Sequence, residues 1–426
     1  MTTRRHFLLA SAAGAVALAS RARAADAVTL GLIGAGGMGV NHLKYLAKRS
    51  DARVAFICDP DADRFAVAAK TLESGGKPTP KMVRDIREVL DDRAVDGVIV
   101  VTPDHWHAPA TILALAAGKH VYVEKPCCHN LREGRLMVEA ARKANRVVQV
   151  GTQSRSSPVV RKAIDRLREG AIGEVLTAKA WNSQLRKNLG HAKPADPPKS
   201  LDYDLWLGPA PFRPYQANML PSVWRFFRDF GTGDIGNDGA HELDIARWGL
   251  GVAGLPAKVV GLGGKLFFDD DQEFPDSYTV AYEYGTGPKP KQLVYEQRIW
   301  SPYVQEGHEN GVAFYGTTGY MVLGKGNGWQ TFGPKNKPLE KVDGRVDLAL
   351  HHDNFIECVR GGKKPSAEIE DGHLSAALAH LGNIACRVGR TLYVDSANER
   401  ILNDPEADAQ LKRTYRKDHW AAPKGA

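Results

Sequence analysis

The sequence predicts an α/β protein of two domains: a doubly wound parallel sheet in the N-terminal part, and an α+β domain with an open, mainly antiparallel sheet in the C-terminal part. Three observations support this fold class. The chain has 426 residues, more than one compact core usually holds. Apolar, β-branched runs alternate with amphipathic helical segments up to Val150, which is typical of a parallel sheet covered on both faces. Beyond Val150, strand-like runs follow one another with Gly, Pro or Asp turns between them.

The first domain is predicted over residues 25–150. Each expected strand is a short apolar run that ends near a glycine, a proline or an acidic residue. Each expected helix has apolar residues three and four positions apart, which places them on one face. The strands are expected at 28–34, 53–59, 95–103, 120–126 and 147–151, and the helices at 40–48, 61–72, 108–119 and 130–145.

The second domain is predicted over residues 151–402, followed by a polar tail at 403–426 that wraps the surface. An exposed face of its open sheet would be a liability for a monomer, so a homo-oligomer is expected. The strands are expected at 173–181, 257–268, 277–285, 291–300 and 311–323, and two helical stretches at 351–362 and 372–389.

Composition and charge exclude some classes of protein. The chain is 43% hydrophobic and 25% charged, which is ordinary for a globular protein. Half of its formal net charge of +8 comes from Arg4, Arg5, Arg21 and Arg23, and the other basic residues are scattered among acids. Without a basic stripe, a nucleic-acid partner is not expected.

Residues 1–24 are predicted to be an export signal. They combine a charged start, a short apolar stretch and Ala22-x-Ala24 before the expected cleavage point. Thr3-Arg4-Arg5-His6-Phe7-Leu8 is similar to a twin-arginine motif, which directs folded proteins to export, so a periplasmic or secreted location is expected. The alternative is an ordinary export signal that contains two arginines. No later run is long and apolar enough for insertion into a membrane.

A glycine-rich turn predicts a dinucleotide site. Residues 34–39 fit G-x-G-x-x-G between the first strand and the first helix, and Asp59 ends the second strand. That context is typical of a Rossmann domain, in which the glycines let the backbone approach the pyrophosphate at the helix N-terminus. Asp59 would accept hydrogen bonds from the ribose hydroxyls, which favours NAD, whereas the nearby Arg64 leaves NADP possible.

Two other strand ends are expected at the same edge, because ligands bind beyond the carboxyl ends of parallel strands. These are "TPDHWH" at 102–107 and "EKP" at 124–126. A lysine ammonium that leaves a buried strand there can polarise a substrate oxygen. The predicted cofactor-binding residues are Gly34, Gly36, Gly37, Met38, Gly39, Asp59, Thr102, Pro103, His105, His107, Glu124 and Lys125.

Together these segments resemble the Gfo/Idh/MocA family of oxidoreductases. The resemblance rests on the glycine turn, "TPDHWH", "GKHVYVEKP" at 118–126, and "GDIGNDGAHELDIARW" at 233–248. It implies a second domain whose sheet covers the nicotinamide end of the cofactor. It also implies hydride transfer to or from a sugar or polyol.

The stretch at 233–248 departs from the family pattern. In the family an Asp usually stands four residues before the His and forms the proton-handling set with the Lys of E-K-P. Here Lys125 and His241 are present, but Asn237 occupies the Asp position and Asp238 follows it. We therefore predict His241 as the base, Lys125 as the group that stabilises the alkoxide, and Asn237 as the residue that positions it.

Two other interpretations of this stretch remain open. On a helix, Asn237, His241, Asp244 and Trp248 share one face, so a capped helix with a packed histidine is possible. A metal site is the other, but no second histidine lies at ligand spacing, so no metal is predicted.

Softer candidates for substrate contact combine polar groups with an aromatic ring, which suits the hydroxyl edges and apolar faces of a sugar. They follow the last strand of the first domain, close a strand of the second sheet, or lie near the stretch at 233–248. They are Arg155, Asn182 (beside Trp181), Trp224 (beside Arg225) and Asp238.

Export and a dinucleotide cofactor together constrain the function. No pool of free NAD is expected outside the cytoplasm, so the cofactor must stay bound and be recycled in place. A sugar or polyol oxidoreductase that uses two substrates in turn meets this condition. So does a redox-neutral glycoside hydrolase or epimerase that acts through a transient keto-sugar. A third possibility is a non-catalytic sugar-binding protein with structural NAD, which the loss of the usual Asp favours.

Overall fold

The computed structural model describes residues 27–324 and 328–426. The predicted export signal at 1–24 lies outside these residues. Within them, no helix has the length and apolar character needed to span a membrane.

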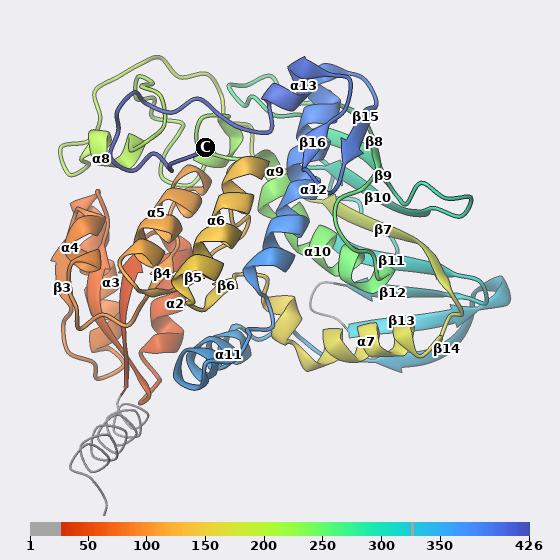
Figure 1. The fold of residues 1–426 in the computed structure, drawn as a ribbon, viewed down its shortest axis with the longest axis horizontal. Helices are drawn as coiled ribbons and strands as arrows, with labels where there is room; N and C mark the ends of the chain where they lie inside the picture. The colour runs from red at the N-terminus through yellow and green to blue at the C-terminus, as the bar shows by residue number, and fades with distance from the viewer. Residues whose placement is uncertain (1–26, 325–327) are drawn as a thin grey trace, which may run out of the picture.

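The N-terminal domain is a six-stranded, all-parallel sheet in the order β3-β2-β1-β4-β5-β6 (Figure 1). This order reverses direction between β1 and β4, which is where a doubly wound sheet binds its ligand. The elements are β1 (Val28–Ile33), α2 (Gly37–Leu46), β2 (Ala52–Cys58), α3 (Phe65–Glu73), β3 (Lys81–Val83), α4 (Ile86–Leu90), β4 (Gly97–Val100), α5 (Asp104–Ala116), β5 (His120–Val123), α6 (Leu131–Ala144) and β6 (Val148–Val150).

Both faces of this sheet are buried, as its continuous apolar strands predict. Helices α4, α5 and α6 cover one face, around Val98 and Val121. Helices α2 and α3 cover the other, together with α11 (Leu348–Gly361), whose Phe355 and Ile356 pack against it. The C-terminal part of the chain therefore returns to the first domain.

The C-terminal domain contains a ten-stranded sheet in the order β14-β13-β12-β11-β7-β10-β9-β8-β15-β16, in which only the β7–β10 pair is parallel. The predicted α/β fold class is confirmed. The strands are β7 (Val175–Ser183), β8 (Lys258–Gly264), β9 (Ser277–Tyr284), β10 (Lys291–Arg298), β11 (Asn310–Gly316), β12 (Tyr320–Gly324), β13 (Gly328–Gly333), β14 (Lys337–Val342), β15 (Leu392–Asp395) and β16 (Arg400–Ile401).

Helices cover one face of this sheet, where alternate residues such as Tyr278, Val280 and Tyr282 of β9 are buried. The helices of this domain include α7 (Pro158–Arg168), α8 (Tyr203–Leu207), α9 (Gly233–Asn237), α10 (Gly239–Leu250), α12 (Ile369–Val388) and α13 (Pro405–Ala409). Helix α12 also packs against α6 and so joins the two domains (Figure 1).

Several predicted boundaries in the second sheet are wrong. The run at 311–323 is a hairpin of β11 and β12, because the chain turns at Thr317–Gly319. The run at 257–268 leaves the sheet after Gly264, where Asp276 accepts hydrogen bonds from three successive backbone N–H groups, of residues 266–268. A single carboxylate thus ends a strand that the apolar pattern would have continued.

The polar tail packs on the first domain. Arg413 donates to a carboxylate oxygen of Glu133 on α6 and to the carbonyl oxygen of His105 on α5. The Tyr415 hydroxyl also donates to Glu133, at 2.7 Å. These contacts place the tail across the start of α5 and α6.

Candidate active site

The glycine turn has the shape that a pyrophosphate requires. A Cβ atom on Gly34, where φ is +98°, would lie 2.5 Å from the carbonyl oxygen of Val101, and one on Gly39 would lie 2.1 Å from that of Gly34. Gly36 and Gly37, in contrast, face open space. No side chain caps α2 at Gly36, so the N–H groups of its first turn remain for an anion. Met38, in that first turn, is 37% exposed.

Asp59 is held beside this turn. Its carboxylate accepts hydrogen bonds from the backbone N–H of Ala35 at 2.7 Å and of Asp61 at 2.9 Å. Burial raises the pKa of Asp59. Arg64 is the cation that left NADP possible in the sequence analysis. In the structure its guanidinium pairs with the carboxylate of Asp61 at 3.2 Å.

The end of β4 completes the fit to a dinucleotide. Thr102 and Pro103 are partly exposed, and within residues 27–324 and 328–426 the buried hydroxyl of Thr102 finds no hydrogen-bond partner. Together with the open glycines and the oriented carboxylate of Asp59, this donor fits NAD.

Lys125 connects the two domains. It follows β5, and its Nζ donates to the backbone oxygen of Asn237 at 2.9 Å and to the side-chain oxygen of Asn237 at 3.3 Å. An ammonium has three N–H donors, so one remains for a ligand. Lys125 is partly exposed, which lets a ligand reach it.

A second contact orients Asn237 and explains why an amide, rather than the carboxylate usual in the family, occupies this position. Its Nδ2 donates to Oδ1 of the buried Asp234 at 2.9 Å, which turns its oxygen toward Lys125. Arg186 pairs with Asp234 at 3.0 Å and with Asp238 at 2.6 Å. A carboxylate at position 237 would face that of Asp234, and like charges at this distance disfavour ionisation.

Glu124, the residue before Lys125, supports the site from the protein interior. It is buried, and its carboxylate accepts from Nε2 of His42 at 3.0 Å and from Gln153 at 3.1 Å. Burial alone would raise the pKa of Glu124, but the hydrogen bond and charge of His42 and the charge of Lys125 hold it at about 2. Because His42 lies on α2, this pair ties the helix of the glycine turn to the strand that carries Lys125.

His241 lies one turn into α10. It is partly exposed and lines a small pocket with Ser154, Val160, Ile245 and Trp329, and its charge acts on Glu124. The predicted single helix is broken here into α9 and α10, with Asp238 between them. Asn237 ends α9 and contacts Lys125, whereas Asp244 and Trp248, on α10, both contact Arg155. The predicted common face is therefore divided between two helices.

The structure corrects the role predicted for Arg155. Its guanidinium is 5% exposed and makes a bidentate pair with the buried Asp244, at 2.8–3.0 Å. It also pairs with Asp371 at 3.3 Å and stacks on Trp248. All three partners belong to the second domain, so Arg155 fixes α10 and α12 to the segment that follows β6, and protein groups occupy the guanidinium in place of the predicted substrate contact.

Other predicted contacts are corrected in the same way. The side chains of His105 and His107 are buried and face backbone carbonyl oxygens, those of Trp206 for His105 and of Thr102 and Pro126 for His107, so they support the turn after β4 from inside. Burial lowers the pKa of His105 to about 3. Asn182 is buried and bonds Asp234 and Gln184, while Trp181 bonds a backbone oxygen.

The remaining substrate candidates keep some exposure. Trp224 is half-buried against Arg225, and Asp238 is partly exposed beside Arg186 and Gln184. Asp244, the carboxylate of the metal interpretation, is fully engaged by Arg155 and Ser375. In the described part of the chain, no group of three His, Cys, Asp or Glu side chains is arranged to hold a metal ion.

The sequence analysis missed three residues that shape the site. They are His42, which holds Glu124, and Arg186 and Asp234, which hold Asn237. Asp234 stands three residues before Asn237, so the helical period could have suggested their contact. Arg186 lies in an irregular segment, and its pairing across 48 residues left no local signal.

Two family models match the chain. One, described as an oxidoreductase family with an NAD-binding Rossmann fold, matches residues 28–152. The other, the C-terminal alpha/beta domain of an oxidoreductase family, matches residues 174–287 and 311–421.

Curated relatives agree with these matches. The scyllo-inositol 2-dehydrogenase (NAD(+)) of Bacillus subtilis strain 168 is 31% identical over 383 residues, which cover 86% of this chain and 96% of that protein. Levoglucosan dehydrogenase of Pseudarthrobacter phenanthrenivorans is 30% identical, over 39% of this chain and 36% of that protein. Glycosyl hydrolase family 109 protein 2 of Shewanella sp. strain ANA-3 is 31% identical, over 36% and 35%. This chain thus spans only about a third of the length of the last two relatives, and 54% of that of the Inositol 2-dehydrogenase 2 of Saccharopolyspora erythraea.

Solved structures share the fold. The aldose-aldose oxidoreductase from Caulobacter crescentus complexed with glycerol has a TM-score of 0.66 at 20% identity, over 86% of this chain and 100% of that chain. The two family matches, the glycine turn and the position of Asp59 agree with this similarity of fold. The chain belongs to the Gfo/Idh/MocA oxidoreductase family.

Proposed function

We propose that this enzyme oxidises a hydroxyl-bearing carbon of a sugar or polyol, and that its NAD stays bound and is recycled in place. The observation that carries the proposal is the Lys125–Asn237 contact, which joins the end of β5 to the last residue of α9, four residues before His241. Relatives named inositol and levoglucosan dehydrogenases support this substrate class.

The chemistry follows from the donors and acceptors at this contact. The glycine turn and Asp59 would hold NAD, which when bound would supply a hydride acceptor for the substrate carbon and, in the reverse reaction, a hydride donor. Lys125 donates its remaining N–H to the substrate oxygen and stabilises the negative charge that develops there. His241 takes the hydroxyl proton, since a ring nitrogen of a neutral imidazole accepts one. Asn237 takes no proton and holds Lys125 in place.

A redox-neutral reaction is the second candidate. In this scheme a hydroxyl is oxidised to a ketone, which acidifies the neighbouring C–H. Loss of that proton expels the leaving group, water then adds to the resulting double bond and restores the proton, and the hydride finally returns to the carbonyl carbon. The relatives named as glycosyl hydrolases of family 109 favour this candidate. A non-catalytic role with structural NAD is the third candidate, and the relatives named as dehydrogenases weigh against it.

Export and assembly complete the proposal. The twin-arginine motif at 3–8 supports export of the folded, NAD-loaded protein to the periplasm or beyond. The face of the second sheet that the helices leave open supports a homo-oligomer. On it Tyr320 stacks on Phe332 at 4.7 Å, and Leu262 is 79% exposed.

The first test is the nucleotide content of the purified protein, denatured without added cofactor. We expect close to one NAD per chain, and turnover of a sugar pair in which one sugar is oxidised and another reduced without free NAD. A protein that is empty, and active only with added NAD, would contradict retention of the cofactor. Release of a glycoside's leaving group with no net reduction would establish the redox-neutral reaction.

The Asn237→Asp variant tests whether the amide is an adaptation of this site. We expect turnover to fall about tenfold near neutral pH, because the new carboxylate faces Asp234 and removes a donor from it. The matched control is the double variant N237D/D234N, in which an amide again faces a carboxylate and turnover partly recovers. A large gain in turnover for N237D alone would instead show that Asn237 disables the site.

A further inference from the structure

A long segment between β7 and α9, residues 184–230, leaves the second sheet, crosses to the first domain and returns. We call it the strap. Its short helix α8 lies beside the first domain, at the far end of the molecule from the second sheet (Figure 1).

The far end of the strap binds the turn that follows β2. The backbone N–H of Ala62 donates to the oxygen of Ser200 at 3.0 Å, and that of Asp202 donates to the oxygen of Pro60 at 2.9 Å. These two bonds make an antiparallel bridge between Asp61 and Leu201. The strap thus holds the same turn whose Asp61 N–H orients the carboxylate of Asp59.

The strap also binds the start of α5, directly after the turn that follows β4. The backbone oxygen of Trp206 accepts hydrogen bonds from the rings of His105 and Trp106, both at 3.0 Å. The backbone N–H of His105 donates to the oxygen of Phe230, at 3.1 Å. Two strand ends that flank the dinucleotide site are therefore bound by one segment of the other domain.

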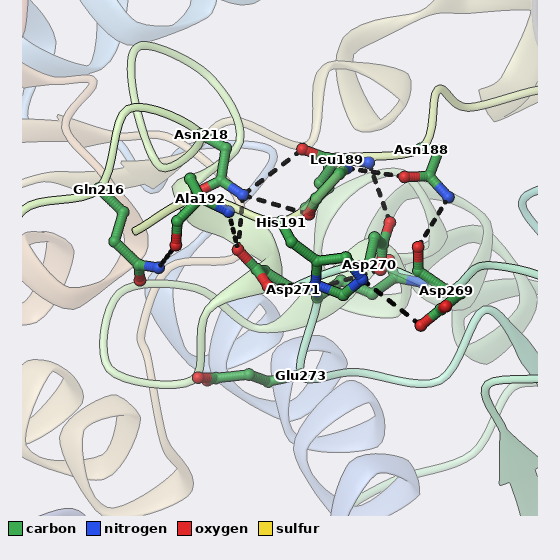
Figure 2. Close-up of polar contacts among 12 residues, drawn as sticks. Asn188, Leu189, His191, Ala192, Gln216, Asn218, Asp269, Asp270, Asp271 and Glu273 are labelled. Carbon is green, nitrogen blue, oxygen red and sulfur yellow. Dashed lines mark hydrogen bonds and ion pairs between the residues drawn. The ribbon is translucent and has the colours of Figure 1, made fainter. Parts of the chain in front are cut away.

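The base of the strap is pinned within its own domain. His191 and Asn218, on its two legs, both bond the carboxylate of Asp271 at 2.8 Å (Figure 2). The backbone N–H of Leu189 donates to Asp270 at 2.9 Å, and Arg213 pairs with Glu273 at 2.7 Å. With both legs fixed to residues 269–273, movement of the far end requires these contacts or the bridge at Asp61 to open.

We infer that the strap forms one side of the site that binds the adenosine end of NAD and that it retains the cofactor there. It binds the turns beside Asp59 and Thr102, so NAD leaves only when the bridge between Asp61 and Leu201 separates. This inference rests on the proposed retention of NAD and gives it a physical cause. It also predicts that the rate of NAD loss depends on residues that bear no catalytic group.

The test measures how fast bound NAD exchanges with isotopically labelled NAD. In one variant, residues 196–214 are replaced by Asn-Gly, because Ala195 and Tyr215 are already paired at 2.9 Å. In the second, D61C/L201C, a disulfide locks the bridge, since non-hydrogen-bonded antiparallel pairs have the Cα spacing that a disulfide needs.

We expect exchange to be about tenfold faster without the end of the strap, and about tenfold slower in oxidised D61C/L201C than in the same protein after reduction. The reduced D61C/L201C protein is the matched control for the oxidised one. If the shortened variant fails to fold, the comparison of these two forms still tests the inference. Equal exchange rates in the oxidised and reduced forms would overturn the inference. If wild-type protein purifies without NAD, retention fails, but loading with labelled NAD still lets the ratio of release rates decide on the strap.

Discussion

Replacing Lys125 by methionine is expected to lower turnover about 10³-fold while NAD remains bound. The Lys125 ammonium links the end of β5 to Asn237 through two hydrogen bonds. Its third N–H remains for a substrate oxygen. Methionine fills similar space but donates no hydrogen bond, so the oxyanion would lose its partner. The measurement is kcat with the best sugar, together with NAD content per chain.

Lys162→Met is the control for this variant, because Lys162 is an exposed lysine on α7, outside the site. Its turnover should equal that of the wild type. A K125M enzyme that keeps turnover within a few-fold of the wild type would remove Lys125 from the reaction. One that has also lost NAD would assign Lys125 to cofactor binding instead.

Replacing Arg155 by glutamine is expected to lower the free energy of unfolding by about 3–5 kcal/mol. The change leaves the carboxylate of Asp244, which is fully buried, without its bidentate partner, and also removes the pair with Asp371 and the contact with Trp248. Arg155, Asp244 and Asp371 all belong to the second domain, so the loss falls on the packing of α10 and α12 against the segment that follows β6. Urea unfolding followed by fluorescence measures it.

Two comparisons make this result specific. Arg168→Gln, at an exposed position on α7 where the arginine makes only a surface pair with Asp165, should change the stability little. The double variant R155Q/D244N removes the unpaired charge and should recover part of the loss. A stable R155Q protein that has lost turnover would restore Arg155 to the predicted role in substrate contact.

Local patterns were sufficient for most of the first domain, because most of its strands are continuous apolar runs and its longer helices have their own periodicity. The edge strand β3 and the short helix α4 were not predicted, since three and five residues are too few to show a period. The glycine turn was readable for the same reason, since Gly34 and Gly39 are required by contacts within one strand–turn–helix unit and with the neighbouring strand β4. The second sheet was less readable, because its ends depend on contacts such as that of Asp276 with residues 266–268.

The candidate site divides in the same way. The sequence by itself determined which chemical groups are present: Lys125 after a buried strand, His241 one helical turn after Asn237, and Asp59 after the second strand. Only the tertiary structure decided what each group faces. It turned Asn237 toward Asp234, buried Arg155 against Asp244 and placed Glu124 on His42. These partners, apart from Asp234, lie more than 80 residues apart in the chain, and charged or polar groups pair by distance in space, which local spacing does not encode.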